Sequence, residues 1–256
     1  MELVDTHAHL TLDPIWDQLG DVLARARDAG VQRMVVPAYD SASWNLIKKL
    51  LSVDGVYGAF GIHPWKADEN LNENELRHLM HLPHAVAIGE IGLDFKVDSV
   101  PRETQLALFR AQVEVAVALD KPVILHCRGA FMEMLDILKY FYGKVRGVVH
   151  AFSRGPDLAA EFVRLGFHIA FGGAITRNNA RNAVAAAAQV PWHMILLETD
   201  CPSIGLHGVK PENTEPMHVA EVARVLARIR QTTVEHVADI TTVNAEKLFA
   251  LPSRMG

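Results

Sequence analysis

Eight short apolar runs rich in β-branched residues recur along this chain of 256 residues, and stretches with helical periodicity separate them. This alternation predicts parallel strands joined by crossover helices. The expected strands span residues 3–7, 34–37, 56–62, 85–91, 122–126, 145–150, 168–171 and 194–198. The clearest expected helices span 16–29, 103–119 and 130–141, and two more, 217–229 and 234–248, follow the last strand.

Eight strand–helix units in about 250 residues are typical of a (β/α)8, or TIM-like, barrel. The hydrophobic fraction of 50% is sufficient for a large core, and no linker rich in Pro, Gly or Ser divides the chain. We therefore expect an α/β fold in which residues 1–256 form a single barrel domain with extra C-terminal helices. A doubly wound open sheet is the alternative.

The composition of the chain bears on its cellular compartment and on the partners that it can bind. The net charge of −5 gives no global basic field, so a polyanionic substrate would have to be met by local charges or metal ions. The cysteines, Cys127 and Cys201, provide no disulfide framework. Because neither a signal peptide nor an apolar run of roughly 18 residues is evident, we expect a cytoplasmic protein with no membrane association. No obligate protein partner is evident.

Ionisable side chains follow or end most of the expected strands. In a parallel barrel these ends converge on one face, where active sites form. Imidazole and carboxylate groups favour zinc or manganese, and magnesium is a further option although it prefers oxygen ligands. The residues are His7 and His9 at the first strand, His63 at the third, Glu90 at the fourth, His126 at the fifth, His150 at the sixth and Asp200 at the eighth.

A single histidine at such a position is more often a hydrogen-bonded core residue than a ligand. The coincidence of several strand ends favours a metal site, because a buried unpaired charge would cost several kcal/mol. Six candidate ligands exceed the needs of one four-coordinate ion, whereas two ions that share a carboxylate would use them all. Side-chain alternation directs Cys127 away from the mouth. Asp5 is expected to orient a histidine.

Five segments resemble, in order and spacing, the TatD family of metal-dependent deoxyribonucleases within the amidohydrolase superfamily. They read VDTHAHL, GEIGLDF, PVILHCRGA, VVHAFSRG and ILLETDCP, and the resemblance extends from residue 4 to 249. It implies a distorted (β/α)8 barrel with two divalent cations per subunit. It also implies that one ion is held by His7, His9 and Asp200, that the other is held by His126 and His150, and that Glu90 bridges them.

The leading interpretation is a deoxyribonuclease or phosphodiesterase that uses a metal-bound hydroxide as nucleophile, with DNA or another phosphoester as substrate. Asp200 would orient or deprotonate the water, and His63 would donate a hydrogen bond or a proton. Arg128 and Arg154 would contact phosphate. Aromatic side chains available for base stacking are Trp65, Phe95, Phe131 and Phe152.

Two other functions compete with this interpretation. One is an amidohydrolase or esterase acting on a C–N, lactone or aminoacyl ester bond of a small molecule or RNA. Such enzymes of the superfamily often bridge their metals with a carboxylated lysine on the fourth strand, and Glu90 stands there instead, which favours the nuclease. The other is a metal protein that binds a ligand without turnover. Departures from the family pattern at Thr11, Met132, Cys201 and residues 205–216 bear on the substrate rather than on the metal ligands.

Overall fold

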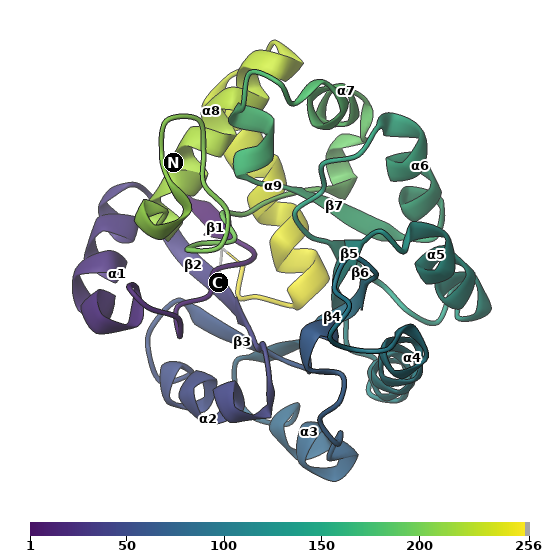
Figure 1. The fold of residues 1–256 in the computed structure, drawn as a ribbon. Helices are drawn as coiled ribbons and strands as arrows, with labels where there is room; N and C mark the ends of the chain where they lie inside the picture. The colour runs from purple at the N-terminus through teal and green to yellow at the C-terminus, as the bar shows by residue number, and fades with distance from the viewer. Residues whose placement is uncertain (254–256) are drawn as a thin grey trace.

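The computed structural model describes residues 1–253 and forms one sheet of eight parallel strands in sequence order (Figure 1). This order confirms the barrel prediction and contradicts the open-sheet alternative, in which the strand order reverses at a switch point. The strands are β1 Leu3–Asp5, β2 Val31–Pro37, β3 Val56–Phe60, β4 Ala85–Asp94, β5 Val123–Arg128, β6 Gly147–Val149, β7 Phe167–Phe171 and β8 Ile195–Leu197.

The first and last strands meet through bonds that lie mostly beyond their ends. The amide of Thr6 donates to the carbonyl of Leu197 at 3.0 Å, and Ala8 forms an isolated parallel bridge with Cys201. The amide of His9 donates to the carbonyl of Cys201 at 2.9 Å. Closure of the ring therefore occurs in the segments that carry the first and last ionisable residues predicted for the site.

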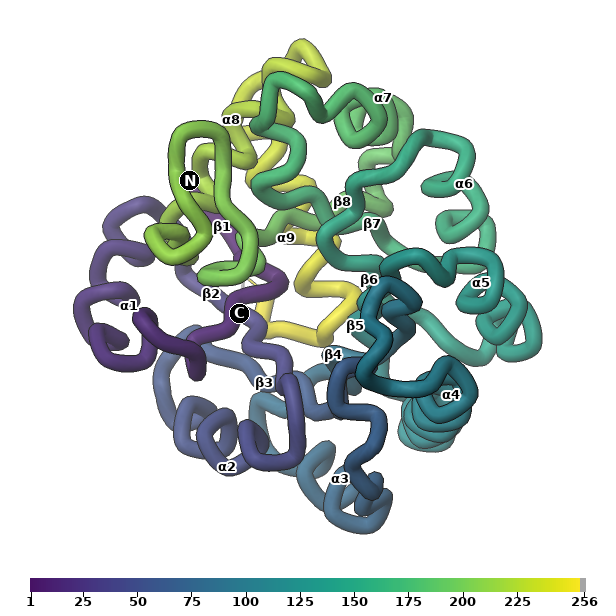
Figure 2. Tube along the Cα trace, in the orientation of Figure 1, coloured from purple at the N-terminus to yellow at the C-terminus, as the bar shows by residue number. Residues whose placement is uncertain are grey.

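Eight helices lie around the outside of the strands (Figure 2). Helix α2 shows why they form: the Asp40 side chain accepts a hydrogen bond from the amide of Ser43 at its start. Its buried residues Trp44, Ile47 and Leu50 then recur at helical spacing. The outer helices are α1 Leu19–Asp28, α2 Ser41–Leu50, α3 Glu73–Leu79, α4 Arg102–Ala118, α5 Phe131–Tyr140, α6 Pro156–Arg164, α7 Arg181–Gln189 and α8 Val219–Arg230.

The last helix, α9 Val234–Phe249, contacts β1 and β8 and appears in yellow near the middle of the ring. Leu248 and Phe249 pack in a buried cluster with strand residues such as Val35 and Leu196, and this cluster is separate from the larger core that includes the outer helices. The chain is held there by Arg33, whose guanidinium lies 2.8 Å from the Glu246 carboxylate.

Several expected strands are longer than the observed ones. The ladders of β1, β6 and β8 end before His7, His150 and Asp200, so these side chains lie in loops rather than in strands. By contrast β4 continues to Asp94, beyond the predicted end at residue 91. Among residues 1–253, no helix combines the length and the apolarity needed to cross a membrane.

Candidate metal centre

The structure brings the six predicted ligands together from five strands at one end of the barrel. Glu90 and His126 lie within β4 and β5, and the others follow β1, β6 and β8. The His126 side chain is 16% exposed. The remaining five are buried, at relative exposures of 6% or less. The side chains of all six predicted ligands therefore converge on one space, as a metal site requires.

Glu90 lies at the middle of this group. Its Oε2 atom lies 3.3 Å from Nε2 of His7 and 3.6 Å from Nε2 of His9. Its Oε1 atom lies 2.7 Å from Nε2 of His150 and 2.9 Å from Nδ1 of His126. Each carboxylate oxygen thus faces a different pair of imidazoles.

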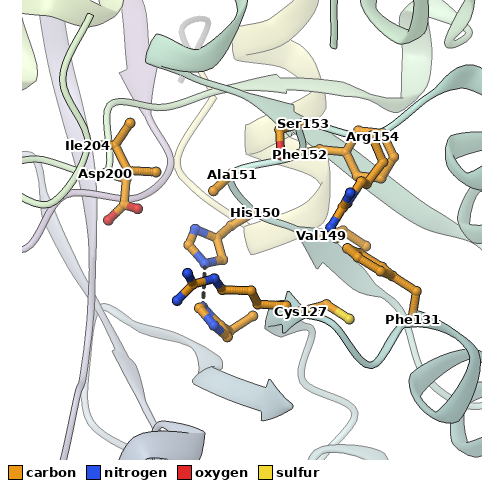
Figure 3. A pocket seen from close by; sticks show the side chains of 12 residues that line it. Cys127, Phe131, Val149, His150, Ala151, Phe152, Ser153, Arg154, Asp200 and Ile204 are labelled. Atoms are coloured by element: carbon orange, nitrogen blue, oxygen red, sulfur yellow. Dashed lines mark hydrogen bonds between the residues drawn. The ribbon is translucent and has the colours of Figure 1, made fainter. Parts of the chain in front are cut away.

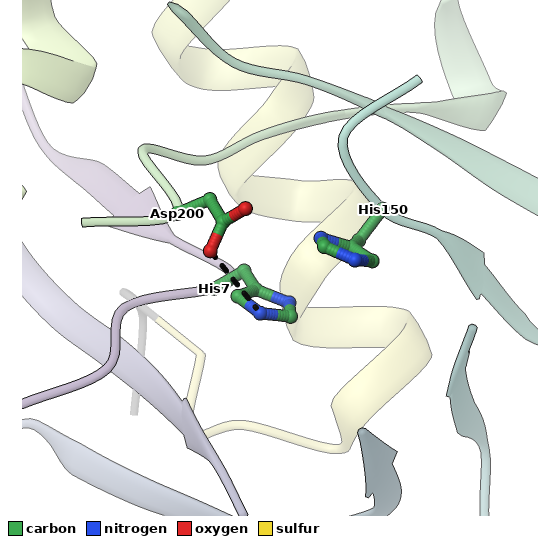
Figure 4. A group of neighbouring side chains, drawn as sticks. All are labelled: His7, His150 and Asp200. Carbon is green, nitrogen blue, oxygen red and sulfur yellow. Dashed lines mark ion pairs between the residues drawn. The ribbon is translucent and has the colours of Figure 1, made fainter. Parts of the chain in front are cut away.

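Asp200 lies beside the first pair. Its Oδ1 atom lies 3.4 Å from Nε2 of His9. The same atom lies 3.8 Å from Nε2 of His7 (Figure 4). The residue has a left-handed backbone with φ of 54°, a conformation that Asp tolerates better than most residues. Its amide donates to the carbonyl of His7 at 2.9 Å, which fixes the carboxylate relative to the β1 segment. The His7 and His150 rings stack at 4.1 Å.

The spacing of the donor atoms fits divalent ions. Tetrahedral zinc with bonds of about 2.0–2.1 Å to nitrogen requires ligand atoms about 3.3–3.4 Å apart. Nε2 of His7 and Nε2 of His9 are 3.2 Å apart, and Nδ1 of His126 and Nε2 of His150 are 3.3 Å apart. Groups of three such residues converge around Glu90 or Asp200. The residues present therefore fit bound metal in both number and chemistry.

The electrostatics of the centre also fit a cation. Burial lowers the pKa of His7 to about 4, so this ring is neutral near pH 7 and its nitrogen can act as a ligand. Burial opposes ionisation of Glu90, but the surrounding imidazoles hold its pKa well below the usual value. Burial likewise disfavours charge on His150, yet the Glu90 carboxylate raises the pKa of that ring to about 10. Positive charge is therefore favoured at the centre of the site.

Asp94 is a site residue that the sequence reasoning missed. It is fully buried at the end of β4, and its Oδ2 atom lies 3.3 Å from Nε2 of His126. The same oxygen accepts a hydrogen bond from the Trp65 indole at 2.7 Å. Because Nε2 of His126 pairs with Asp94, the ring is oriented so that its other nitrogen, Nδ1, faces Glu90. The signal was available, because residues four apart on a strand lie on the same face.

Glu198 was also missed. It is 1% exposed, and its Oε1 atom lies 3.9 Å from Nδ1 of His150, on the side of the ring opposite Glu90. The same atom accepts a hydrogen bond from the amide of Ala151. Burial raises the pKa of Glu198 to about 8. The position of Glu198, two residues before Asp200, could have indicated that it belongs to the site.

The prediction for Asp5 was wrong in detail. We expected this carboxylate to orient an imidazole, but Oδ1 accepts from the backbone amides of His7 and Thr199, at 3.2 and 3.0 Å. Oδ2 accepts from the Thr199 hydroxyl at 2.6 Å. Asp5 therefore joins the β1 segment to the segment after β8 through the His7 amide and through the amide and hydroxyl of Thr199.

The other predicted residues lie around the mouth. His63 is buried, with Nε2 3.4 Å from Oε1 of Glu90. A cavity of about 560 Å³ opens over the metal centre, and its lining includes the apolar groups of Leu12, Tyr39, Trp65 and Ile204. Trp65 is 40% exposed there.

A second cavity, of about 270 Å³, adjoins the centre beside β5 and β6 and is lined by Arg128, Phe131 and Arg154 (Figure 3). The Arg154 guanidinium lies 5.1 Å from the centre of the Phe131 ring. Phe95 and Phe152 are buried, so these two aromatic residues contribute packing rather than an open stacking surface. Both cysteines are free.

Comparison with known proteins decides the family. A model of the family described as TatD related DNase matches residues 4–250. The chain belongs to the TatD family. The chain is also similar to an uncharacterized metal-dependent hydrolase of Bacillus subtilis, YabD, with 34% identity over 97% of this chain and 99% of the relative.

The TatD fold is equally evident in solved structures. The TatD homologue YjjV of Escherichia coli matches with a TM-score of 0.92 and 32% identity, covering 98% of each chain. A TatD family hydrolase of Entamoeba histolytica matches with a TM-score of 0.86 at 21% identity, over 97% of this chain and 98% of that one. The protein is thus a TatD family metal-dependent hydrolase, and its side-chain clusters offer the ligands for the metal.

Proposed function

We propose that this protein is a two-metal phosphodiesterase whose substrate is DNA. The observation that carries the proposal is the position of Glu90, with one carboxylate oxygen toward His7 and His9 and the other toward His126 and His150. A carboxylate in this position can bridge two ions, and paired ions about 3.5–4 Å apart are a recurrent solution for phosphodiester hydrolysis. The family description as DNases supports a nucleic-acid substrate.

In this proposal His7, His9 and Asp200 hold one ion, His126 and His150 hold the other, and Glu90 contacts both. Bound zinc or manganese ions would supply a nucleophile at neutral pH and offset the negative charge that develops on the phosphate. Asp94 fixes the ring of His126 so that Nδ1 faces the centre.

Proton transfer falls to two residues at the mouth. Asp200 uses one oxygen beside His9, and its other oxygen accepts the proton of the attacking water. Burial lowers the pKa of His63 to about 4, so this ring is neutral near pH 7. As a neutral imidazole it donates a hydrogen bond to the leaving oxygen. Arg128 and Arg154 contact the phosphate. Nη1 of Arg128 lies 3.8 Å from Oδ2 of Asp94.

The rival function is hydrolysis of a C–N or ester bond. A β-aspartyl dipeptidase and an organophosphorus hydrolase share the fold, with TM-scores of 0.67 and 0.66, but their 16% and 15% identities carry no information on activity. Glu90 occupies the fourth-strand position at which such enzymes often carry a carboxylated lysine. The two-sided contact of Glu90 favours the phosphodiesterase.

An activity screen tests the proposal. Metal-free protein is reconstituted with zinc or manganese and assayed on single-stranded DNA, duplex DNA, phosphomonoesters, lactones and amides. We expect metal-dependent cleavage of DNA, and the chelated protein is the control. Cleavage of lactones or amides without any phosphodiester hydrolysis would contradict the proposal and support the rival function.

A further inference from the structure

The segments around the mouth of the barrel divide by charge. Arg128 ends β5, and the segments after β6 and β7 contain Arg154 and Arg177. The segments between β5, β6 and β7 and the helices that follow them contain no acidic residue, and the last of them leads to Arg181 at the start of α7. The segments after β1, β2 and β3 contain five acidic residues and one lysine. A polyanion that reaches the metal centre is therefore attracted to the β5–β7 side and repelled from the β1–β3 side.

The β5–β7 side also provides a continuous surface. The cavity of about 270 Å³ beside the centre, which contains His150 and Arg154, is lined at its far end by Ser153. Ser153 also lines the next cavity, of about 410 Å³, together with Arg177 and Arg181. The two cavities therefore lead from the metal centre across β6 to the start of α7, and the acidic residue among those that line them is the proposed ligand Asp200.

Two of the arginines on this surface are positioned by contacts. Arg154 lies over the Phe131 ring, and one Arg177 guanidinium nitrogen donates to the carbonyl of Gly205 at 3.0 Å. A guanidinium has five N–H donors in a planar fork that suits phosphate oxygens. The larger cavity over the centre is lined by the apolar groups of Leu12 and Trp65, and Arg128 is the one arginine that lines it.

We infer that Arg154, Arg177 and Arg181 form a phosphate-binding track for a single strand of nucleic acid that extends from the scissile phosphate across β6 and β7. A single strand is required because the ligands are buried, and a stiff duplex would have to deform to bring a phosphate to them. The inference rests on the proposed function and adds that contacts several phosphates from the cleaved bond contribute to substrate binding.

The test compares a long and a short substrate in the metal-loaded protein. The double variant Arg177→Gln/Arg181→Gln is assayed on a single-stranded 12-nucleotide DNA and on bis(4-nitrophenyl) phosphate, which is too small to reach the track. We expect KM for the oligonucleotide to rise about tenfold. We also expect the slope of log KM against the logarithm of the salt concentration to fall by about 1.4, because each lost phosphate contact with a single strand lowers this slope by roughly 0.7. We expect kcat/KM for the small diester to remain unchanged.

The matched control is Arg164→Gln, because Arg164 is 65% exposed and lines a cavity with Lys144 and Arg146, away from the mouth. Arg181→Gln alone provides a second variant that leaves the Arg177 bond to Gly205 intact. An unchanged KM and salt dependence in both track variants, with the oligonucleotide still cleaved, would overturn the track but leave the phosphodiesterase proposal standing. If the unmodified protein cleaves neither diester, the proposed function fails and the track fails with it. Equal KM values for the duplex and the single strand would overturn the single-strand assignment.

Discussion

Replacement of Glu90 by Gln is expected to reduce phosphodiester hydrolysis by about 10³-fold or more while the barrel remains folded. The amide keeps the volume of the side chain, but it removes the charge and puts an NH₂ group where the second oxygen faces an imidazole pair. At least one of the two proposed ions should then be lost. Steady-state kinetics and the metal content of the purified variant measure the two effects.

The matched control for this variant is Glu235→Gln, an exposed glutamate in the first turn of α9. It should retain full activity and metal content. Circular dichroism verifies that both variants are folded. Undiminished hydrolysis by Glu90→Gln, or a loss of activity with both ions still bound, would contradict the bridging role.

Replacement of Gly92 by Ala is expected to lower the free energy of unfolding by about 3–5 kcal/mol. Gly92 lies on β4 between Glu90 and Asp94 with φ of 149°, and a Cβ atom there would overlap the backbone of His126 on β5. The substitution would separate two strands that both carry site residues. Chemical denaturation in the presence of a chelator measures the change without the contribution of bound metal.

Gly208→Ala is the control, because Gly208 also has a positive φ, of 76°, but no atom lies within 4 Å of its Cβ position. We expect it to lower the free energy of unfolding by only about 1–2 kcal/mol, the cost of a left-handed backbone at a residue with a Cβ atom. Equal losses in the two variants would show that the close approach of β4 to β5 does not constrain Gly92.

Much of this fold was predictable from the sequence, because each strand is a short apolar run and each helix has its own periodicity. The ends of the strands were less predictable. His7, His150 and Asp200 were placed in or directly at strands, whereas the chain leaves the ladder earlier to turn these side chains inward. That turn depends on contacts between distant segments, such as the amide of Asp200 with the carbonyl of His7, which have no local signal.

The residues that support the ligands were likewise not predictable from local sequence. Asp94 and Glu198 lie in motifs that were recognised, but their roles depend on which ring nitrogen each one faces in space. Asp5 was assigned to the correct site and to the wrong partner, because alternation along a strand gives the face of a side chain and not whether it meets a ring or a backbone amide. Residue types and periodicity thus predict which face a group joins, and the contacts follow only from the folded chain.

The central claim is that one chain holds two ions through Glu90, and calorimetric titration of metal-free protein with zinc tests it most directly. We predict saturation at two equivalents per chain, and saturation at one equivalent or fewer for the Glu90→Gln variant. Saturation of the unmodified protein at a single equivalent, or two equivalents bound equally well by the variant, would contradict the account.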